Sequence, residues 1–174
     1  MWWSKLIALG LAAVLLGACG FRPIYATGPD ADRAVAADLA QIRIDPIADR
    51  VGQQLRNNLV DSFGSSIGNP PARYTLKVTL NESIQKLAVQ RDQLATRGNY
   101  NLQASYTLSD ASGVLHRASH RVISSYNILS SDFANLTAEQ DARTRAAREI
   151  GDAIRSSLSS YFVSRAGGQT SQVQ

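Results

Sequence analysis

Three groups of side chains in this sequence could carry chemistry: one cysteine, two histidines and a set of basic residues near the middle of the chain. Cys19 is the only thiol, so a disulfide within the chain has no second partner and the sulfur is left for modification. His116 and His120 are four residues apart, which on a strand separates them by about 13 Å and excludes a shared metal ion. The candidate chemistry is therefore modification of a thiol and binding through charge.

Cys19 stands directly after a short apolar segment. Lys5 precedes a run of about eleven mostly apolar residues, which is too short to span a bilayer, and two small residues follow that run. The pattern resembles a bacterial lipoprotein signal, in which the thiol is diacylated, the chain is cut before the cysteine and the new amino terminus is acylated. A free cysteine at the end of a signal peptide is the alternative. We expect residues 1–18 to be a signal peptide and Cys19 to be the lipidation site.

The rest of the chain is long enough for one domain with a real core, and it has no second apolar segment long enough to cross a membrane. Gly20, in place of an aspartate after the cysteine, predicts sorting to the outer membrane on its periplasmic side. A nucleic-acid partner is not expected after export.

Basic residues outnumber acidic ones between Pro71 and Ser125. A phosphate-rich partner would explain this excess, and so would a solvated strand face. The basic residues are Arg73, Lys77, Lys86, Arg91, Arg97, Arg117 and Arg121, against Glu82, Asp92 and Asp110.

A strand and a helix are predicted after the cysteine. Alternation of apolar and polar residues predicts a strand over residues 39–44. Apolar residues then recur every four positions from Ile47 to Ile67, which predicts an amphipathic helix that Gly64 and Gly68 end. Its start is capped by Asp45, with Pro46 at the first helical position, or by Asp49.

Three strands and a second helix follow. A period of two predicts a strand from Tyr74 to Val89, with a bulge or a twist at residues 81–83. It predicts further strands over 100–108 and 114–126, with a turn at 109–113. His116 and His120 have the inward parity and are expected to be partly buried or at a strand end. After a polar loop over 127–136, Thr137 and Gln140 form a capping box for a helix with an Asp141–Arg145 pair.

The order strand, helix, three strands, helix predicts an α+β fold. We expect a two-layer sandwich with a four-stranded mixed sheet, both amphipathic helices on one face, and an open polar face on the other. The predicted organisation is a lipidated tether over residues 19–38, one domain over 39–163, and a disordered polar tail over 164–174.

The sequence has no constellation typical of an enzyme. A Gly-rich phosphate loop, a His-x-x-x-His pair on a helix and a Gly-x-Ser-x-Gly elbow are all absent from the sequence, and its carboxylates are scattered over predicted helix surfaces and turns. We therefore expect a binding or scaffolding protein without a cofactor or metal.

Four segments together resemble one family. They are Cys-Gly-Phe-Arg-Pro-Ile-Tyr (19–25), Arg-Val-Gly-Gln-Gln-Leu-Arg-Asn-Asn-Leu (50–59), Thr-Arg-Gly-Asn-Tyr-Asn-Leu-Gln-Ala-Ser-Tyr-Thr-Leu (96–108), and the block from Ser125-Tyr126 to Tyr161-Phe162. In this order they are similar to the lipopolysaccharide-assembly lipoprotein family LptE, in its alphaproteobacterial form. The resemblance covers essentially the whole chain after the signal.

The resemblance implies a non-enzymatic plug inside the lumen of the outer-membrane β-barrel LptD, which assembles with that barrel and assists lipopolysaccharide delivery to the cell surface. It also implies lipopolysaccharide binding, for which the candidates by character and region are Arg91, Arg97, Lys86, Arg117 and Arg121. These side chains could instead solvate the sheet or contact the barrel. A free, periplasm-facing ligand-binding or transport-accessory lipoprotein is the alternative function, and it would need a concave apolar pocket.

Overall fold

The structure, a computed structural model, describes residues 29–64, 71–88 and 95–170. It divides into two units, residues 1–32 and 33–174, and the described part of the first unit is the start of a helix. The predicted signal peptide and Cys19 lie outside the described residues. The second unit contains the sheet and the helices that cover it.

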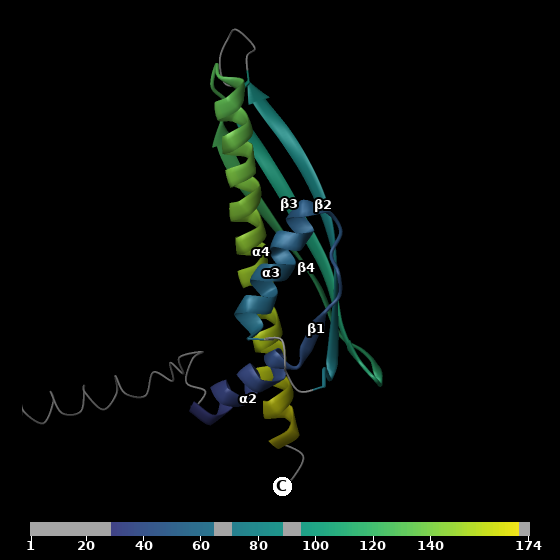
Figure 1. Ribbon diagram of the computed structural model, residues 1–174. Helices are drawn as coiled ribbons and strands as arrows, with labels where there is room; N and C mark the ends of the chain where they lie inside the picture. The colour runs from purple at the N-terminus through teal and green to yellow at the C-terminus, as the bar shows by residue number, and fades with distance from the viewer. Residues whose placement is uncertain (1–28, 65–70, 89–94, 171–174) are drawn as a thin grey trace, which may run out of the picture. The chain divides into compact units, whose positions relative to one another are not determined.

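The elements in chain order are helix α2 (Pro29–Ala40), strand β1 (Ile42–Ile44), helix α3 (Asp49–Phe63), strands β2 (Tyr74–Ala88), β3 (Ala95–Asp110) and β4 (Gly113–Asn127), and helix α4 (Asp132–Thr170). The strands form one sheet in the order β1-β2-β3-β4. β1 is parallel to β2, and the other neighbours are antiparallel. Figure 1 shows α3 and α4 on the same side of this sheet. The predicted α+β class and the mixed four-stranded sheet are confirmed.

The described chain has three helices where the sequence predicted two. α2 occupies much of the predicted tether and continues to Ala40, so that buried Leu39 is helical and the first strand has only three residues. Gln41 makes the turn between them, because its backbone N–H donates to the carbonyl of Asp38 at 3.1 Å. The alternation in Ile42 and Ile44 was assigned correctly, and both side chains are buried.

Both capping predictions for α3 were wrong. The residue at the N-cap is Ala48, which has no side-chain capping bond, and Asp49 is the first helical residue, with a φ of 67°. The end was predicted correctly, since Gly64 takes the left-handed conformation with a φ of 66° and closes the helix. The apolar face predicted from the four-residue spacing is also confirmed, because Val51, Leu55, Leu59 and Phe63 are buried.

β2 is continuous through residues 81–83, so there is no bulge where the sequence predicted a bulge or a twist. Glu82 keeps the inward parity of the strand because its carboxylate accepts a hydrogen bond from Tyr100. The irregularity lies between Leu87 and Ala88. A polar residue on the inner face therefore did not interrupt the strand, since the fold supplies it with a partner.

α4 begins at Asp132, five residues before the predicted capping box. Ser131 accepts a hydrogen bond from the backbone of Ala134, whereas the hydroxyl of Thr137 donates to the carbonyl of Phe133 within the helix. The helix runs to Thr170, so residues 164–170 are helical where the sequence predicted a polar tail. The predicted pair of Asp141 and Arg145 is confirmed.

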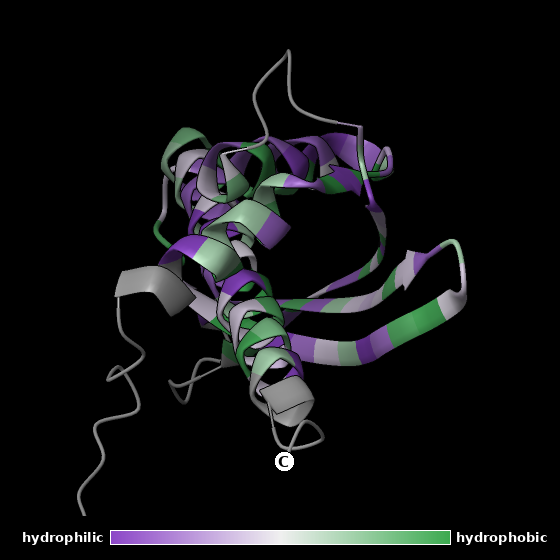
Figure 2. Cartoon of the chain, turned by 90° about the horizontal axis from the view of Figure 1, so that it is seen from below, coloured by the Kyte–Doolittle hydropathy of each residue, from purple (hydrophilic) through white to green (hydrophobic). Residues whose placement is uncertain are grey.

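The core lies between α4, α3 and the inner face of the sheet. Apolar and polar residues alternate along the strands, as the hydropathy colours of Figure 2 show. Small residues on α4 allow this helix to pack close to its neighbours. Each fully buried leucine contributes about 1.5–3 kcal/mol to the free energy of folding. The fully buried positions include Leu55, Leu59, Leu76, Tyr100, Leu102, Ala104, Leu108, Ala142, Ala146, Ala147, Ile150, Ile154 and Leu158. Within the described ranges, none of the helices is both long and apolar enough to cross a bilayer.

Candidate binding surfaces

The structure does not bring the predicted lipopolysaccharide-binding residues together. Arg91 lies outside the described residues. Lys86 is exposed on the helix side of β2, whereas Arg97, Arg117 and Arg121 are exposed on the opposite side, which we call the open face. Along β4, Arg117 and Arg121 are about 13 Å apart. The predicted set therefore divides between two surfaces.

Lys86 lies at one end of the sheet beside a depression of about 320 Å³. The end of β2, the end of β4 and the first turns of α4 form its walls. It is lined by Lys86, Tyr126, Ile128, Asp132, Asn135, Leu136 and Glu139. The lining thus combines one cation and two carboxylates with apolar and aromatic groups, and the cation, Lys86, lies at its outer edge on β2.

Apolar side chains are exposed at this same end of the molecule. The exposed fractions are 60% for Leu129, 80% for Phe133 and 61% for Leu136, all on the chain that enters α4 or on its first turns. On β2, Leu87 is 42% exposed. We call Lys86, Leu129, Phe133 and Leu136 the sheet tip; Leu87 has the opposite parity and faces the other side of the sheet. The sequence prediction assigned residues 127–136 to a polar loop, although the spacing of 129, 133 and 136 is helical and could have revealed an apolar stripe.

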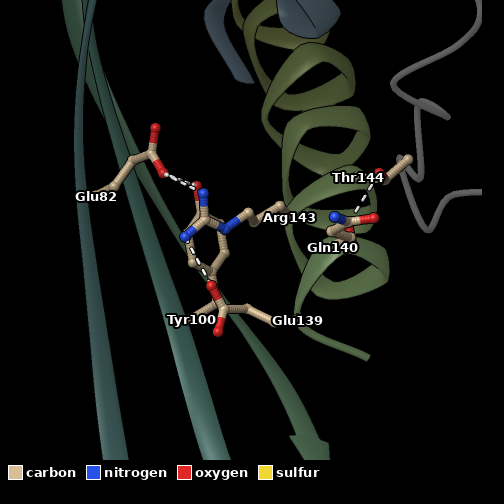
Figure 3. A network of polar contacts seen from close by, with 6 residues as sticks. All are labelled: Glu82, Tyr100, Glu139, Gln140, Arg143 and Thr144. Carbon is tan, nitrogen blue, oxygen red and sulfur yellow. Dashed lines mark hydrogen bonds and ion pairs between the residues drawn. The ribbon is translucent and has the colours of Figure 1, made fainter. Parts of the chain in front are cut away.

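Next to the depression beside Lys86, a polar network joins α4 to the sheet (Figure 3). The hydroxyl of Tyr100 donates a 2.8 Å hydrogen bond to Glu82 Oε2. Arg143 lies 3.9 Å from the same oxygen through Nη1 and 2.7 Å from Glu139 through Nη2, and its Cζ atom is 5.5 Å from the centre of the Tyr100 ring. Burial, and then the hydrogen bond to Glu82, raises the pKa of Tyr100 above its usual value.

The network has the form of a clamp. Two carboxylates share one guanidinium, and together with Tyr100 these contacts hold the helix against the strands. A second depression, of about 180 Å³, lies between α3 and α4 next to this network. On its wall the hydroxyl of Thr144 donates to the backbone carbonyl of Gln140 at 3.0 Å, a bond within the helix. These contacts hold α4 against the sheet and within its own helical turns.

The two histidines are half-buried between β4 and α4, as their parity predicted. His120 Nε2 lies 3.2 Å from the hydroxyl of Tyr106, and His116 Nε2 lies 3.4 Å from the hydroxyl of Ser157. The ring of His116 also lies 5.1 Å from that of Tyr161. Each imidazole therefore has its own partner. Across residues 29–64, 71–88 and 95–170, no three His, Cys, Asp or Glu residues are grouped to bind a metal ion.

Comparison with solved structures gives lipoproteins of the same fold. A putative lipoprotein from Caulobacter crescentus is 27% identical, covers 75% of this chain and 96% of its own, and has a TM-score of 0.63. Rare lipoprotein B from Shewanella oneidensis, at 10% identity and a TM-score of 0.57, covers 72% of this chain and 98% of its own. At that identity the likeness is one of fold alone. A search of curated proteins gave no match.

Comparison with protein families gives a match over residues 39–158 to the family described as "LptE: Lipopolysaccharide-assembly". The matched range takes in β1, α3, the three long strands and most of α4. It includes the sheet tip and the open face. Because this range is more than half of the chain and spans its folded core, the protein belongs to the LptE family of lipopolysaccharide-assembly lipoproteins.

Proposed function

We propose that this protein is an outer-membrane lipoprotein that occupies the lumen of the LptD β-barrel, assembles with it, and assists lipopolysaccharide delivery to the cell surface. The observation that carries the proposal is the family match across the folded domain. The family is not a family of enzymes, in agreement with a polar network that holds elements together. Lipidation of Cys19 would keep the domain beside its barrel at a high effective concentration.

The surface of the domain supports this proposal. A barrel lumen is polar and wet, so a plug needs polar groups on both of its sides. Here the helices and the open face both present polar side chains outward. The alternative, a free ligand-binding lipoprotein, needs a concave apolar pocket. Three depressions that described residues of α4 help to line hold about 110–320 Å³ and include charged side chains in their walls.

We assign lipopolysaccharide contact to the sheet tip. Lipid A joins phosphate groups to acyl chains, and the tip joins Lys86 to the exposed apolar side chains of Leu129, Phe133 and Leu136. Arg97 lies on the neighbouring strand, one position from the residue that pairs with Lys86, and it faces the other side. Arg97 is therefore not part of the tip, where the ammonium group of Lys86 is the suitable partner for phosphate oxygens.

Affinity purification from solubilised outer membranes tests the assembly. The lipid-anchored protein should recover a β-barrel several times its own size. Recovery of the lipoprotein alone, together with normal surface lipopolysaccharide after depletion, would contradict the proposal.

Lipopolysaccharide binding is tested separately with purified protein. The substitution Lys86→Glu, and the double substitution Phe133→Ser and Leu136→Ser, should each weaken binding about tenfold or more, a change of about 1.4 kcal/mol. The control is Arg148→Glu on the exposed side of α4. Because all the substituted side chains are exposed or at the rim of a depression, the melting temperature should stay within about 2 °C. Unchanged binding in both variants would remove the tip from the ligand site.

A further inference from the structure

The open face carries charge of one sign. It consists of Arg43 on β1 and the odd-numbered residues 75–87 of β2, 97–107 of β3 and 117–127 of β4, as the register places them; Asn101 at its centre is buried, and the charged positions are exposed. At these positions of the described strands there is no aspartate or glutamate. The basic side chains on the face are Arg43, Lys77, Arg97, Arg117 and Arg121.

The outward surface of the helices differs, because it carries charges of both signs. Exposed acidic residues outnumber exposed basic ones there, and one pair, Asp141 with Arg145, is joined on the surface. The exposed charged residues of α3 and α4 are Asp49, Arg50, Asp61, Asp132, Asp141, Arg145, Arg148, Glu149, Asp152 and Arg155. Electrostatic complementarity therefore distinguishes the two sides of the domain, and only the sheet side selects an acidic partner.

The cations are spread along the face instead of surrounding one depression. The register places Lys77 and Arg117 in one row on either side of Thr107, about 10 Å apart across two strand spacings. Arg121 lies four residues further along β4, and Arg97 lies in the row with Leu87 and Asn127, near the sheet tip. This spacing favours several separate contacts with an extended surface over the capture of one phosphate group.

Between the cations, the face consists mainly of hydrogen-bonding groups. Most of its other positions are serine, threonine, asparagine or glutamine, and Leu87 and Ile123 are its large apolar residues. Eleven to thirteen residues along each of three strands span about 40 Å by about 15 Å, or about 600 Å², somewhat less than the roughly 800 Å² that each partner contributes to a standard interface. The area and the polarity match a wet protein surface.

We propose that the open face docks against the lumen wall of the barrel, on a strip that carries carboxylates, while the helices face away from that strip. This inference rests on the proposed function, and it adds which face makes the contact and the charge of the surface it meets. Along the strands of a barrel, polar side chains that face the lumen alternate with apolar side chains that face the lipid. A lumen wall can therefore present rows of carboxylates opposite the rows of cations on this face. Arg117 and Arg121, predicted from the sequence as lipopolysaccharide ligands, are thereby assigned to the barrel.

The test compares two pairs of charge reversals in the full, lipid-anchored chain expressed with its barrel. Arg117→Glu with Arg121→Glu should lower the barrel recovered at low salt about tenfold, and recovery of the unaltered protein should fall as salt rises. The matched control, Arg148→Glu with Arg155→Glu on α4, makes the same change in net charge and should recover the barrel within about twofold of the unaltered protein.

Photo-crosslinking provides a measurement that does not depend on charge reversal. A crosslinking residue at Gln103, exposed at the centre of the open face, should join the protein to the barrel in clearly higher yield than one at Gln53, exposed on α3. Equal yields, or a higher yield from Gln53, would overturn the assignment.

The other outcomes are also decisive. Full barrel recovery by the open-face variant, or equal loss in both variants, would overturn the assignment and leave the proposed function standing. Loss of lipopolysaccharide binding with full barrel recovery would show that the face is a ligand surface and would overturn the assignment as well. If the unaltered protein recovers no barrel, the proposed function fails and the docking face fails with it.

Discussion

Gly98 on β3 lies directly beneath the ring of Tyr126 on β4. The two residues are paired in the sheet, and a Cβ atom at position 98 would lie 2.4 Å from Cζ of the tyrosine. No side chain can share that space, so the ring crosses the neighbouring strand only because residue 98 is glycine. In this position Tyr126 is buried and forms a wall of the depression beside Lys86.

The first prediction concerns this contact. Gly98→Ala should displace the Tyr126 ring and lower the free energy of unfolding by about 1–3 kcal/mol, because the core must open to admit the methyl group. Urea unfolding and near-ultraviolet circular dichroism measure the two effects. Gly151→Ala on α4 is the control: its Cβ would lie 3.5 Å from Leu55 Cδ1, an ordinary contact, and alanine favours the helix. Equal stability of the two variants would contradict the close approach.

The second prediction concerns the clamp between α4 and the sheet. Tyr100→Phe keeps the ring but removes the hydroxyl that donates to Glu82, so the free energy of unfolding should fall by about 1–2 kcal/mol. At about 2–4 °C per kcal/mol, thermal melting resolves such a change. Tyr74→Phe removes a longer bond, of 3.4 Å, to Asp38 and should cost less. If Tyr74→Phe lowers the free energy of unfolding more than Tyr100→Phe does, the hydrogen bond from Tyr100 to Glu82 is not the stronger of the two.

The third prediction is a loss of stability in alkali. Burial is the largest cause that raises the pKa of Tyr100, Tyr106 and Tyr126 above the ordinary value of 10.0. A group with a higher pKa in the folded state binds its proton more tightly there, so its contribution is complete below about pH 10 and declines as the pH rises above it. Urea unfolding between about pH 8 and 11 should show a decline that begins near pH 10. Tyr100→Phe should make it shallower, and an equally steep decline would exclude Tyr100 as a source.

The fourth prediction concerns the start of α4. The side chain of Asn135 accepts from the backbone N–H of Leu129 at 2.7 Å and donates to the carbonyl of the same residue at 2.8 Å. Asn135→Ala should therefore destabilise the protein by about 1 kcal/mol and increase hydrogen exchange in the first turns of the helix. Thr137→Ala should have little effect, because Thr137 lies inside the helix and does not cap it. A larger effect of Thr137→Ala would restore the capping box predicted from the sequence.

Much of the fold could be predicted from the sequence, because each strand and helix must place its apolar residues on one side. The alternation from Tyr74 to Leu80 and the four-residue spacing from Val51 to Phe63 follow from that requirement alone, and the core confirms both. Element boundaries were less certain. Thr137 and Gln140 satisfy the capping pattern, but the helix had already begun at Asp132, because Ser131 and Asn135 bind the backbone there.

The sequence by itself determined the class of fold, the inward and outward parity of the strands, and the segments that identify the family, since these depend on local periodicity and on residue order. Only the tertiary structure decided which of the basic residues share a surface. Lys86 and Arg97 are neighbours across two strands but have opposite parity, so they lie on opposite sides of the sheet. Charge counted along the chain cannot distinguish the sheet tip from the open face, because side chains distant in sequence become neighbours only through strand register.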